Sequence, residues 1–171
     1  MLAELGYERA TMSVIAKRAH SSIGSLYQFF PNKRSVAEAL RTQYIKEIEQ
    51  YWLNLADQAG ALTAEQLACR LVTVQLEIVE KHPALLALLD VPATTRTSKQ
   101  REMIRTRIAT VLMAHKPRLS RPVALRIASV VQQVSRGLLA LYGQTEVCQK
   151  GAIIEEFKSV LAGYLVPRLK C

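Results

Sequence analysis

Hydrophobic positions along the chain recur with the three- to four-residue spacing of amphipathic helices, and no segment shows the two-residue alternation of a strand. Glycine and proline fall mostly where this helical spacing stops. The pattern predicts helices over residues 1–5, 12–19, 23–29, 33–59, 64–81, 84–90, 98–115, 120–142 and 151–166. The fold class is therefore predicted to be all-α.

Residue types that begin or end helices support these boundaries. Short polar side chains favour the N-cap position because they accept a hydrogen bond from the first free backbone N–H groups. The expected N-caps are Thr11, Asn32 and either Ser21 or Ser22. The expected stops are Gly6, Gly60, His82-Pro83, and the positions before Pro117 and Pro167.

Apolar residues cover more than one face of the two C-terminal helices, over residues 120–142 and 151–166. A helix that packs on one side needs an apolar stripe only about 100° wide. The broader coverage indicates two packing surfaces, and it fits either a partner subunit or full burial within a monomer. Because two-fold dimers dominate soluble oligomers, we favour a homodimer formed through residues of about 120–166.

The stretch from Thr11 to Lys33 has the proportions of a helix-turn-helix. It combines a short helix, a break at residues 20–22 and a second short helix. Apolar residues of both helices are expected to form the small core that fixes their crossing, namely Val14, Ile15, Ala19, Leu26 and Phe30. The N-terminal half of the second helix would then face solvent, and in such motifs this is the part that enters a major groove.

The residues on that exposed half suit close approach to a duplex. Serine hydroxyls donate to phosphates or base edges, and Gly24 has no side chain to hold the helix away from the bases. Glycine inside a helix costs roughly 0.5–1 kcal/mol relative to alanine, which favours a role beyond folding. Ile23 would either contact a base or pack inward. The expected DNA-binding residues are Thr11, Ser22, Ile23, Gly24, Ser25, Tyr27 and Lys33.

Four short motifs follow one another in this stretch. They are Thr11 at a helix start, Ile15-Ala16-Lys17-Arg18-Ala19, Ser22-Ile23-Gly24-Ser25-Leu26-Tyr27 and Phe30-Pro31-Asn32-Lys33. The series resembles the TetR family of bacterial transcriptional regulators, whose recognition helix reads S-x-G-S/T-L-Y followed by F-P-x-K. The resemblance implies an all-helical homodimer with a C-terminal effector-binding domain. It also implies a dimer interface built from the last two helices, and in most members a repressor that its effector releases from DNA.

Two features depart from the family pattern. His20 stands where glycine is usual, so a left-handed turn there would cost roughly 1–2 kcal/mol, and Ser21 replaces the usual aliphatic residue. Only residues 1–5 precede Gly6, where the family has a full helix, so the first helix is expected to be truncated. These departures keep an alternative open, namely a helical ligand-binding or protein-interaction module with a non-functional DNA-binding head.

The net charge of +9 favours an anionic partner such as nucleic acid, but the charge is unevenly spread. Residues 1–46 carry seven cationic and three acidic residues, and residues 47–95 carry two and seven. Residues 96–171 carry fourteen cationic and four acidic residues. Because this C-terminal excess is the largest, charge alone does not locate the DNA-binding face.

A small-molecule effector site is expected where aromatic and polar side chains interrupt the apolar stripes after residue 46. Apolar walls suit such pockets, and a buried amide needs a hydrogen-bond partner. We predict an effector site that includes Trp52, Gln75, Met103, Arg105 and Gln133. Arg101 shares a helix face with Arg105, and the two could receive an acidic effector, although a solvated basic face would explain them as well. Gln132 also lies beside an apolar stripe, and ordinary core packing would explain the aromatic and apolar residues.

The sequence predicts a regulator and not an enzyme. It contains no nucleophile–base pairing, phosphate loop or metal-ligand spacing, and its three cysteines are dispersed, so no cofactor or metal is expected. We expect residues 1–46 to form the helix-turn-helix domain and residues 47–171 the effector-binding and dimerisation domain. The expected partners are a double-stranded DNA operator, an effector and a second copy of the chain, without a membrane, in the cytoplasm.

Overall fold

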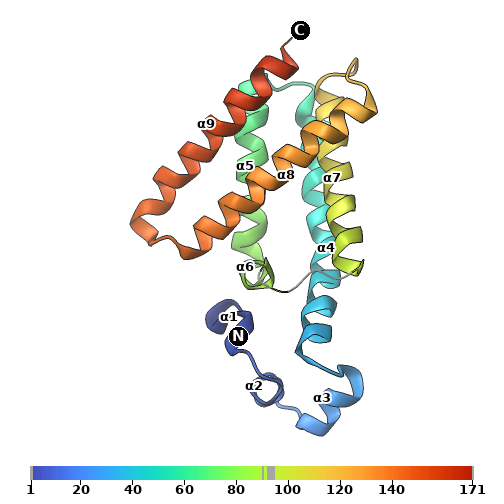
Figure 1. Cartoon of the computed structure of the whole chain (residues 1–171), viewed down its shortest axis with the longest axis vertical. Helices are drawn as coiled ribbons and strands as arrows, with labels where there is room; N and C mark the ends of the chain where they lie inside the picture. Colours follow the sequence, from blue (N-terminus) through green and yellow to red (C-terminus); the bar gives the residue numbers. More distant parts are fainter. Residues whose placement is uncertain (1, 90, 92–94, 171) are drawn as a thin grey trace.

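The computed structural model describes residues 2–89, 91 and 95–170, and these residues form helices without a strand. The elements are α1 (Leu2–Arg9), α2 (Met12–Arg18), α3 (Ile23–Phe29), α4 (Lys33–Ala59), α5 (Ala64–Lys81), α6 (Ala84–Leu89), α7 (Thr95–His115), α8 (Arg121–Gln144), η1 (Val147–Gln149) and α9 (Lys150–Leu169). In Figure 1, α1, α2 and α3 form a head at one end of α4, and α5 and α7–α9 form a helical body along the rest of it. The predicted all-α fold is confirmed.

Several helix boundaries differ from the predicted ones; α1 ends at Arg9 and α8 at Gln144, a few residues later than predicted. Helix α7 begins at Thr95 and not at residue 98, and the short η1 was not predicted. The predicted stop before Pro167 is wrong, because α9 continues to Leu169. Burial of Leu169 fixes the last turn, and the carbonyl that Pro167 cannot reach belongs to exposed Gly163. Residues 1 and 90, at the ends of two predicted helices, lie outside the described residues.

Helix α1 changes direction at Gly6. The backbone there has φ 72° and ψ 173°, which is not helical, so the predicted stop at Gly6 is confirmed and residues 7–9 add a separate turn. Glycine is suited to this position because positive φ carries no side-chain clash. Leu2 and Tyr7 on either side of the break are buried in one cluster with Leu88 of α6 and Ala37 of α4. The head is thereby attached to both α4 and α6.

Helix α5 lies at the centre of the body and packs against α9 on one side and α4 on another. Its side chains are buried around much of its circumference because neighbouring helices cover several of its faces. The most deeply buried residues of the body include Leu67, Leu71, Leu112, Val131 and Leu165, from α5, α7, α8 and α9. None of the described helices has the length and apolar character needed to span a membrane.

Helix α4 belongs to both parts of the molecule. Near its start, Ala37 is buried against α1 and α6, and Val36 packs on the core between α2 and α3. Further along, Trp52 and Leu55 are buried in the body. A single continuous helix therefore contacts both the head and the body.

Candidate functional sites: an exposed recognition helix and a basic cavity

Side-chain hydroxyls begin both helices of the motif. Thr11 Oγ1 accepts a hydrogen bond from the Val14 backbone N–H at 3.2 Å, which caps α2. Ser22 Oγ accepts one from the Ser25 N–H at 3.0 Å, which caps α3, and Ser22 Oγ also donates to Ser25 Oγ at 2.9 Å. The predicted N-cap roles of Thr11 and Ser22 are confirmed. The Ser25 hydroxyl proton has no hydrogen-bond partner among the described residues, so it is available to an acceptor outside the chain.

The core between α2 and α3 is only partly the predicted one. Ile15 and Leu26 are buried in it and Phe30 packs against it, as expected. Val14 is 36% exposed and Ala19 is also exposed, so their predicted packing is wrong. The buried positions are taken by Met12 and Ala16, with Val36 of α4 packed alongside, because residues 12, 15 and 16 share one face of α2.

The turn between α2 and α3 places His20 in the left-handed region. Its φ is 50°, and it is the described non-glycine residue with a positive φ. The Ser21 backbone N–H donates to the Ala16 carbonyl at 3.0 Å, so the turn closes the end of α2. The predicted left-handed conformation at His20 is confirmed, and its steric cost is present in the folded head.

We expect His20→Gly to stabilise the protein by about 1 kcal/mol, because glycine adopts positive φ without the clash of a Cβ atom. His20→Ala should instead destabilise it, since alanine tolerates this region less well than histidine. Thermal unfolding followed by circular dichroism should therefore rank the melting temperatures as glycine above histidine above alanine. An alanine variant that melts at or above the glycine variant would show that the turn carries no such strain.

The outward side of α3 presents the residues expected to meet DNA. Ser22, Gly24 and Ser25 are exposed, Ile23 is 45% exposed and Tyr27 is 49% exposed. These residues form the exposed part of α3, whereas Leu26 is buried against α2. The structure thus brings six of the seven predicted DNA-binding residues, with Thr11 at the start of α2, to the solvent side of the head.

Phe29 also lies on the surface of α3, and sequence reasoning did not include it. Its side chain is 77% exposed although phenylalanine is a typical core residue. The signal available in the sequence was the pair Phe29-Phe30 at the end of a short helix, where only one of two consecutive residues can face the core. Phe30 is the one that packs inward.

Lys33, the seventh predicted DNA-binding residue, is engaged within the head. Its ammonium nitrogen Nζ donates to the backbone carbonyls of Tyr7 at 2.8 Å and Glu8 at 3.1 Å. The same nitrogen lies 4.3 Å from the centre of the Tyr7 ring. A cation at the carbonyl end of a helix satisfies free acceptors there and offsets the helix dipole. Lys33 therefore fastens the end of α1 to the start of α4.

Replacement of Lys33 by methionine, which keeps the length of the side chain, should loosen α1. Hydrogen bonds from a charged group contribute roughly 1.5–3 kcal/mol, and Lys33→Met removes two of them. Hydrogen exchange should become faster at the α1 amides while those of α5 keep their protection. Lys46→Met, at an exposed lysine further along α4, is the matched control. Unchanged exchange in α1 would contradict an anchoring role for Lys33.

A second polar contact joins α1 to α2. Arg18 makes two parallel hydrogen bonds to Glu4, with Nη1 to Oε2 at 2.7 Å and Nη2 to Oε1 at 2.8 Å. The hydrogen bond from Arg18 holds the pKa of the Glu4 carboxyl below its usual value. Both side chains are more than half exposed, so this ion pair orients α1 more than it stabilises the fold.

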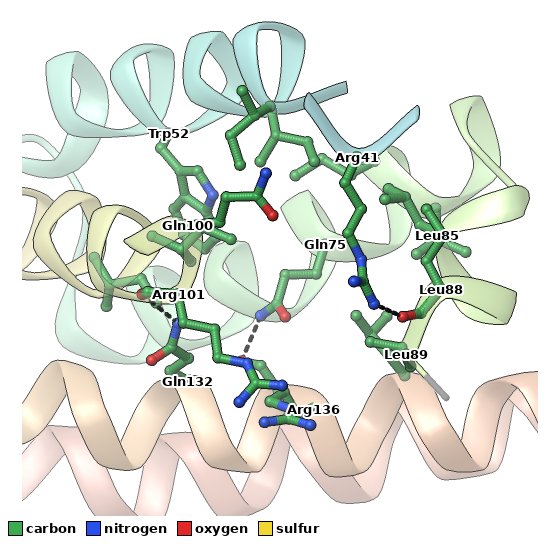
Figure 2. Close-up of a pocket in the computed structure, with 18 residues that line it drawn as sticks. Arg41, Trp52, Gln75, Leu85, Leu88, Leu89, Gln100, Arg101, Gln132 and Arg136 are labelled. Carbon is green, nitrogen blue, oxygen red and sulfur yellow. Dashed lines mark hydrogen bonds between the residues drawn. The ribbon is translucent and has the colours of Figure 1, made fainter. Parts of the chain in front are cut away.

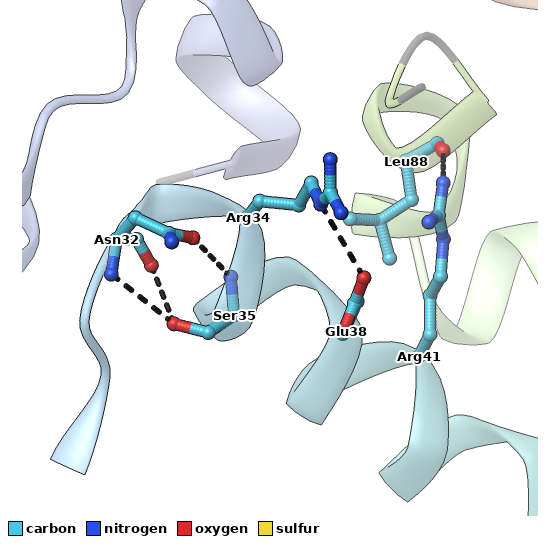
Figure 3. Close-up of polar contacts among 6 residues, drawn as sticks. All are labelled: Asn32, Arg34, Ser35, Glu38, Arg41 and Leu88. Carbon is cyan, nitrogen blue, oxygen red and sulfur yellow. Dashed lines mark hydrogen bonds and ion pairs between the residues drawn. The ribbon is translucent and has the colours of Figure 1, made fainter. Parts of the chain in front are cut away.

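The start of α4 is fixed by a reciprocal cap (Figure 3). Asn32 Oδ1 accepts from the Ser35 backbone N–H at 2.9 Å, and Ser35 Oγ accepts from the Asn32 N–H at 3.3 Å. Within the first two turns of α4, Arg34 Nε also lies 3.6 Å from Glu38 Oε1. Figure 3 also shows Arg41 of α4 donating to the backbone carbonyl of Leu88, near the end of α6. This contact links α4 directly to α6.

The body contains a cavity of about 190 Å³ between α4, α5, α6, α7 and α8 (Figure 2). Each long helix contributes residues of one helical stripe. From α4 these are Arg41, Ile45, Ile48 and Trp52; from α7 they are Gln100, Arg101, Ile104 and Ile108; from α8 they are Gln132, Ser135, Arg136 and Leu139. Gln75, Ile78 and Val79 of α5 and Leu85, Leu88 and Leu89 of α6 complete the lining. The wall is thus mostly apolar, with a few polar groups and three arginines.

The polar groups in the wall are partly committed to one another. Gln75 Nε2 donates to the Leu71 carbonyl at 2.7 Å and to Ser135 Oγ at 2.6 Å. Ser135 Oγ in turn donates to the Val131 carbonyl at 2.7 Å. Gln132 Nε2 donates to the backbone carbonyl of Arg101 at 2.9 Å. These bonds fix the amide and hydroxyl groups in defined orientations.

Positive charge is concentrated on this cavity. Burial lowers the pKa of the Arg41 guanidinium from its usual value, and the nearby charge of Arg101 lowers it further, while Glu38 acts in the opposite direction. Arginine stays protonated despite such shifts, so the cavity keeps its charge at neutral pH. Arg41 belongs at once to the cavity wall and to the contact with α6.

Only some of the predicted effector-site residues line the cavity. Trp52 and Gln75 line the cavity. Met103 and Arg105 of α7 lie outside its lining, and Arg105 pairs with Glu102 on its own helix. Gln133 is exposed and borders a shallow depression on the outer side of α8.

Sequence reasoning considered Arg101, together with Arg105, as able to receive an acidic effector, but it included none of the cavity arginines in the predicted site. The signal was the i, i+3, i+4, i+7 spacing of Gln132, Ser135, Arg136 and Leu139 on α8, which marks one helix face with polar residues among apolar ones. On α7 the polar residues are spread around the helix, so the pattern did not indicate that Arg101 and not Arg105 faces inward.

Comparison with known proteins places this architecture in a class of helical bacterial regulatory proteins with an N-terminal helix-turn-helix. Residues 1–40 match the family described as bacterial regulatory proteins, tetR family, and residues 54–165 match the tetracyclin repressor-like C-terminal domain. The chain belongs to the TetR family, as the motif residues indicated.

A relative in Bacillus subtilis (strain 168) bears the name uncharacterized HTH-type transcriptional regulator YhgD. It is 28% identical to this chain over 103 residues, which cover 59% of this chain and 52% of that protein. The chain thus matches about half the length of this relative. Its name agrees with the family assignment and states no ligand.

Proposed function

We propose that the chain is a homodimeric transcriptional repressor that binds an operator through α3 and leaves it when a small molecule occupies the cavity. The observation that carries this proposal is the dual position of α4. One end of α4 packs on the helix-turn-helix through Val36 and on α1 through Ala37, and its middle lines the cavity through Arg41, Ile45 and Trp52. A ligand in the cavity thus touches the same helix that sets the position of the head.

The proposed DNA contacts follow from exposure and chemistry. Ser25 and Tyr27 present hydroxyl groups on the outer side of α3, where they reach phosphates or base edges. Gly24 leaves room for the helix in the major groove, and Ile23 offers an apolar contact to a thymine methyl group. Thr11 and Ser22 cap their helices and point free N–H groups toward the backbone phosphates. Lys33 supports the head and adds positive charge near its surface.

The proposed homodimer uses the outer faces of α8 and α9. Val130 and Leu141 of α8 are 40% and 46% exposed, and Val160 of α9 is 53% exposed. Exposed small residues such as Gly137 and Gly163 lie on the same two helices. A surface of apolar and small residues suits a self-complementary two-fold interface. Two heads would then reach successive major grooves, about 34–36 Å apart, on a near-palindromic operator.

The proposed release rests on the contact between Arg41 and the Leu88 carbonyl. A ligand in the cavity that displaces the Arg41 side chain would weaken this contact and allow α4 to move against α6. Such a ligand shifts the equilibrium only as far as it binds one arrangement more tightly than the other. A protein that acts on operator DNA in this way would work in the bacterial cytoplasm.

The test is binding of the purified protein to DNA fragments that flank its own gene, across a series of salt concentrations. We expect saturable binding of two protomers to one fragment, with affinity that falls as salt increases because phosphate contacts release counterions. Ser25→Ala/Tyr27→Ala should abolish this binding, whereas Val147→Ala, at an exposed residue outside the head, should leave it intact. Equal binding to random DNA would overturn the proposal and favour a helical ligand-binding module instead.

A further inference from the structure

Two arginines of the cavity, Arg101 and Arg136, differ from their neighbours in their ionic partners. On α7, Arg105 and Arg107 pair with Glu102 and Glu49. Arg101, on the same helix, forms no ion pair with any described carboxylate, and no acidic side chain is found among the described residues that line the cavity.

Arg136 of α8 is likewise without an ion-pair partner in the described part of the chain. In Figure 2 the guanidinium groups of Arg101 and Arg136 lie on the α8 side of the cavity, and that of Arg41 lies toward α6. Charges that are taken out of bulk water favour a counterion, and a guanidinium offers planar pairs of N–H donors that match a carboxylate. Arg101 and Arg136 therefore give the cavity a preference for a negatively charged group that none of the described lining residues matches.

Trp52 adds an independent sign of a missing acceptor. Its side chain is 3% exposed, and the indole Nε1–H is buried without a hydrogen-bond partner among the described residues. Figure 2 shows the ring reaching from α4 into the cavity lining. Indole can only donate a hydrogen bond, and a buried donor left unpaired is destabilising. A ligand oxygen in the cavity would satisfy it.

The remaining polar groups of the described wall supply no negative charge, and several of them are already committed within the protein. The amide N–H groups of Gln75 and Gln132 already donate within the protein, and Ser135 links Gln75 to the Val131 carbonyl. The rest of the wall is apolar, with Ile48, Ile104 and Ile108 among its residues. A molecule that complements this cavity has a negatively charged, oxygen-rich end and an apolar body.

We propose that the effector is an organic carboxylate with an apolar body, whose carboxylate is held by Arg101 and Arg136 and whose body packs against Trp52 and the isoleucines of α4 and α7. This inference rests on the proposed role of the cavity as an effector site, and it adds the chemical class of the ligand. It also assigns Arg101 and Arg136 as the residues that select a carboxylate over a neutral molecule of the same shape.

The experiment compares three probes with the same apolar chain and different heads, namely octanoate, 1-octanol and octylamine, below the concentrations at which they form micelles. Trp52 is the single tryptophan of the chain and lines the cavity, so its fluorescence reports occupancy directly. We expect octanoate to bind at least about tenfold more tightly than 1-octanol, and octylamine to bind least, because the guanidinium groups pair with carboxylate.

Two variants connect this preference to the proposed residues. Arg101→Gln/Arg136→Gln should remove the tenfold advantage of octanoate while leaving the affinity for 1-octanol unchanged, which shows that the cavity is still folded. Arg126→Gln, at an exposed arginine of α8 outside the cavity, should keep the advantage. Equal binding of octanoate and 1-octanol, a stronger response to octylamine, or no response of Trp52 to any probe would overturn the inference.

A wrong ligand class can be distinguished from a wrong proposed function. Release of operator DNA is measured in a separate titration with the same probes. Carboxylate-selective binding without DNA release would support the ligand class and contradict the proposed coupling through α4. Release of DNA by 1-octanol as readily as by octanoate would support the coupling and contradict the ligand class.

Discussion

Gly24→Gln should reduce operator affinity by at least about 100-fold while the protein remains fully folded. Gly24 is exposed on α3, and a Cβ atom added there would meet only Ser22 Oγ, at the ordinary contact distance of 3.8 Å. Glutamine is also a better helix former than glycine, by several tenths of a kcal/mol. The expected loss therefore arises on DNA, where the longer side chain holds α3 out of the groove and leaves mainly non-specific binding.

Two further variants distinguish the effect of a large side chain on the DNA-facing side of α3 from the effect of replacing a glycine elsewhere. Gly24→Ala adds only one methyl group and should weaken binding much less than Gly24→Gln. Gly60→Gln places the same side chain at an exposed glycine after α4, where the Cβ atom would lie 3.6 Å from the Ala114 carbonyl oxygen. Fluorescence anisotropy with labelled operator DNA and thermal unfolding measure the two properties. Parental affinity in Gly24→Gln would mean that this side of α3 does not enter DNA.

Val130→Arg/Val160→Arg should convert the proposed homodimer into a folded monomer. Both valines are about half exposed in the single chain, so their replacement leaves the body core intact. In a two-fold interface each new arginine would be desolvated near its symmetry-related copy, and like charges brought together at an interface cost several kcal/mol. We expect the monomer mass in analytical ultracentrifugation at concentrations where the parent protein is dimeric.

Loss of the dimer should also weaken operator binding strongly, because a monomer engages one half-site and loses the gain from the second. Val147→Arg, at an exposed valine of η1 between α8 and α9, introduces the same charge and should leave the mass unchanged. The melting temperature of the double variant, measured at a concentration where the parent is monomeric, should match that of the parent. A double variant that stays dimeric would place the interface on another surface.

The helices of the head could be predicted because their determinants lie close together in the chain. Thr11, Ser22 and Asn32 each accept a hydrogen bond from the backbone three residues later, so the sequence alone contains both partners. The left-handed turn at His20 and the break at Gly6 are local in the same sense. The family resemblance rests on these same residues, and for that reason it could be stated before the structure.

The positions of individual side chains depended on contacts between distant segments. Lys33 is a cation at a helix start in the sequence, but its ammonium group binds carbonyls 26 and 25 residues away, at the end of α1. Val14 and Ala19 have the residue type of a core, yet they lie outside the face of α2 that packs on Leu26. Pro167 ends helices as a rule, whereas burial of Leu169 keeps α9 intact beyond it.

The cavity is the feature that only the tertiary structure decided. The sequence by itself determined that the chain is helical, that its N-terminal part carries a helix-turn-helix, and that polar residues such as Gln75 interrupt apolar stripes. It did not determine that Arg101 and Arg136 meet in one cavity, because these residues are 35 positions apart and lie on different helices. Helical periodicity fixes which residues share a face, but the packing of α4, α7 and α8 fixes which faces meet.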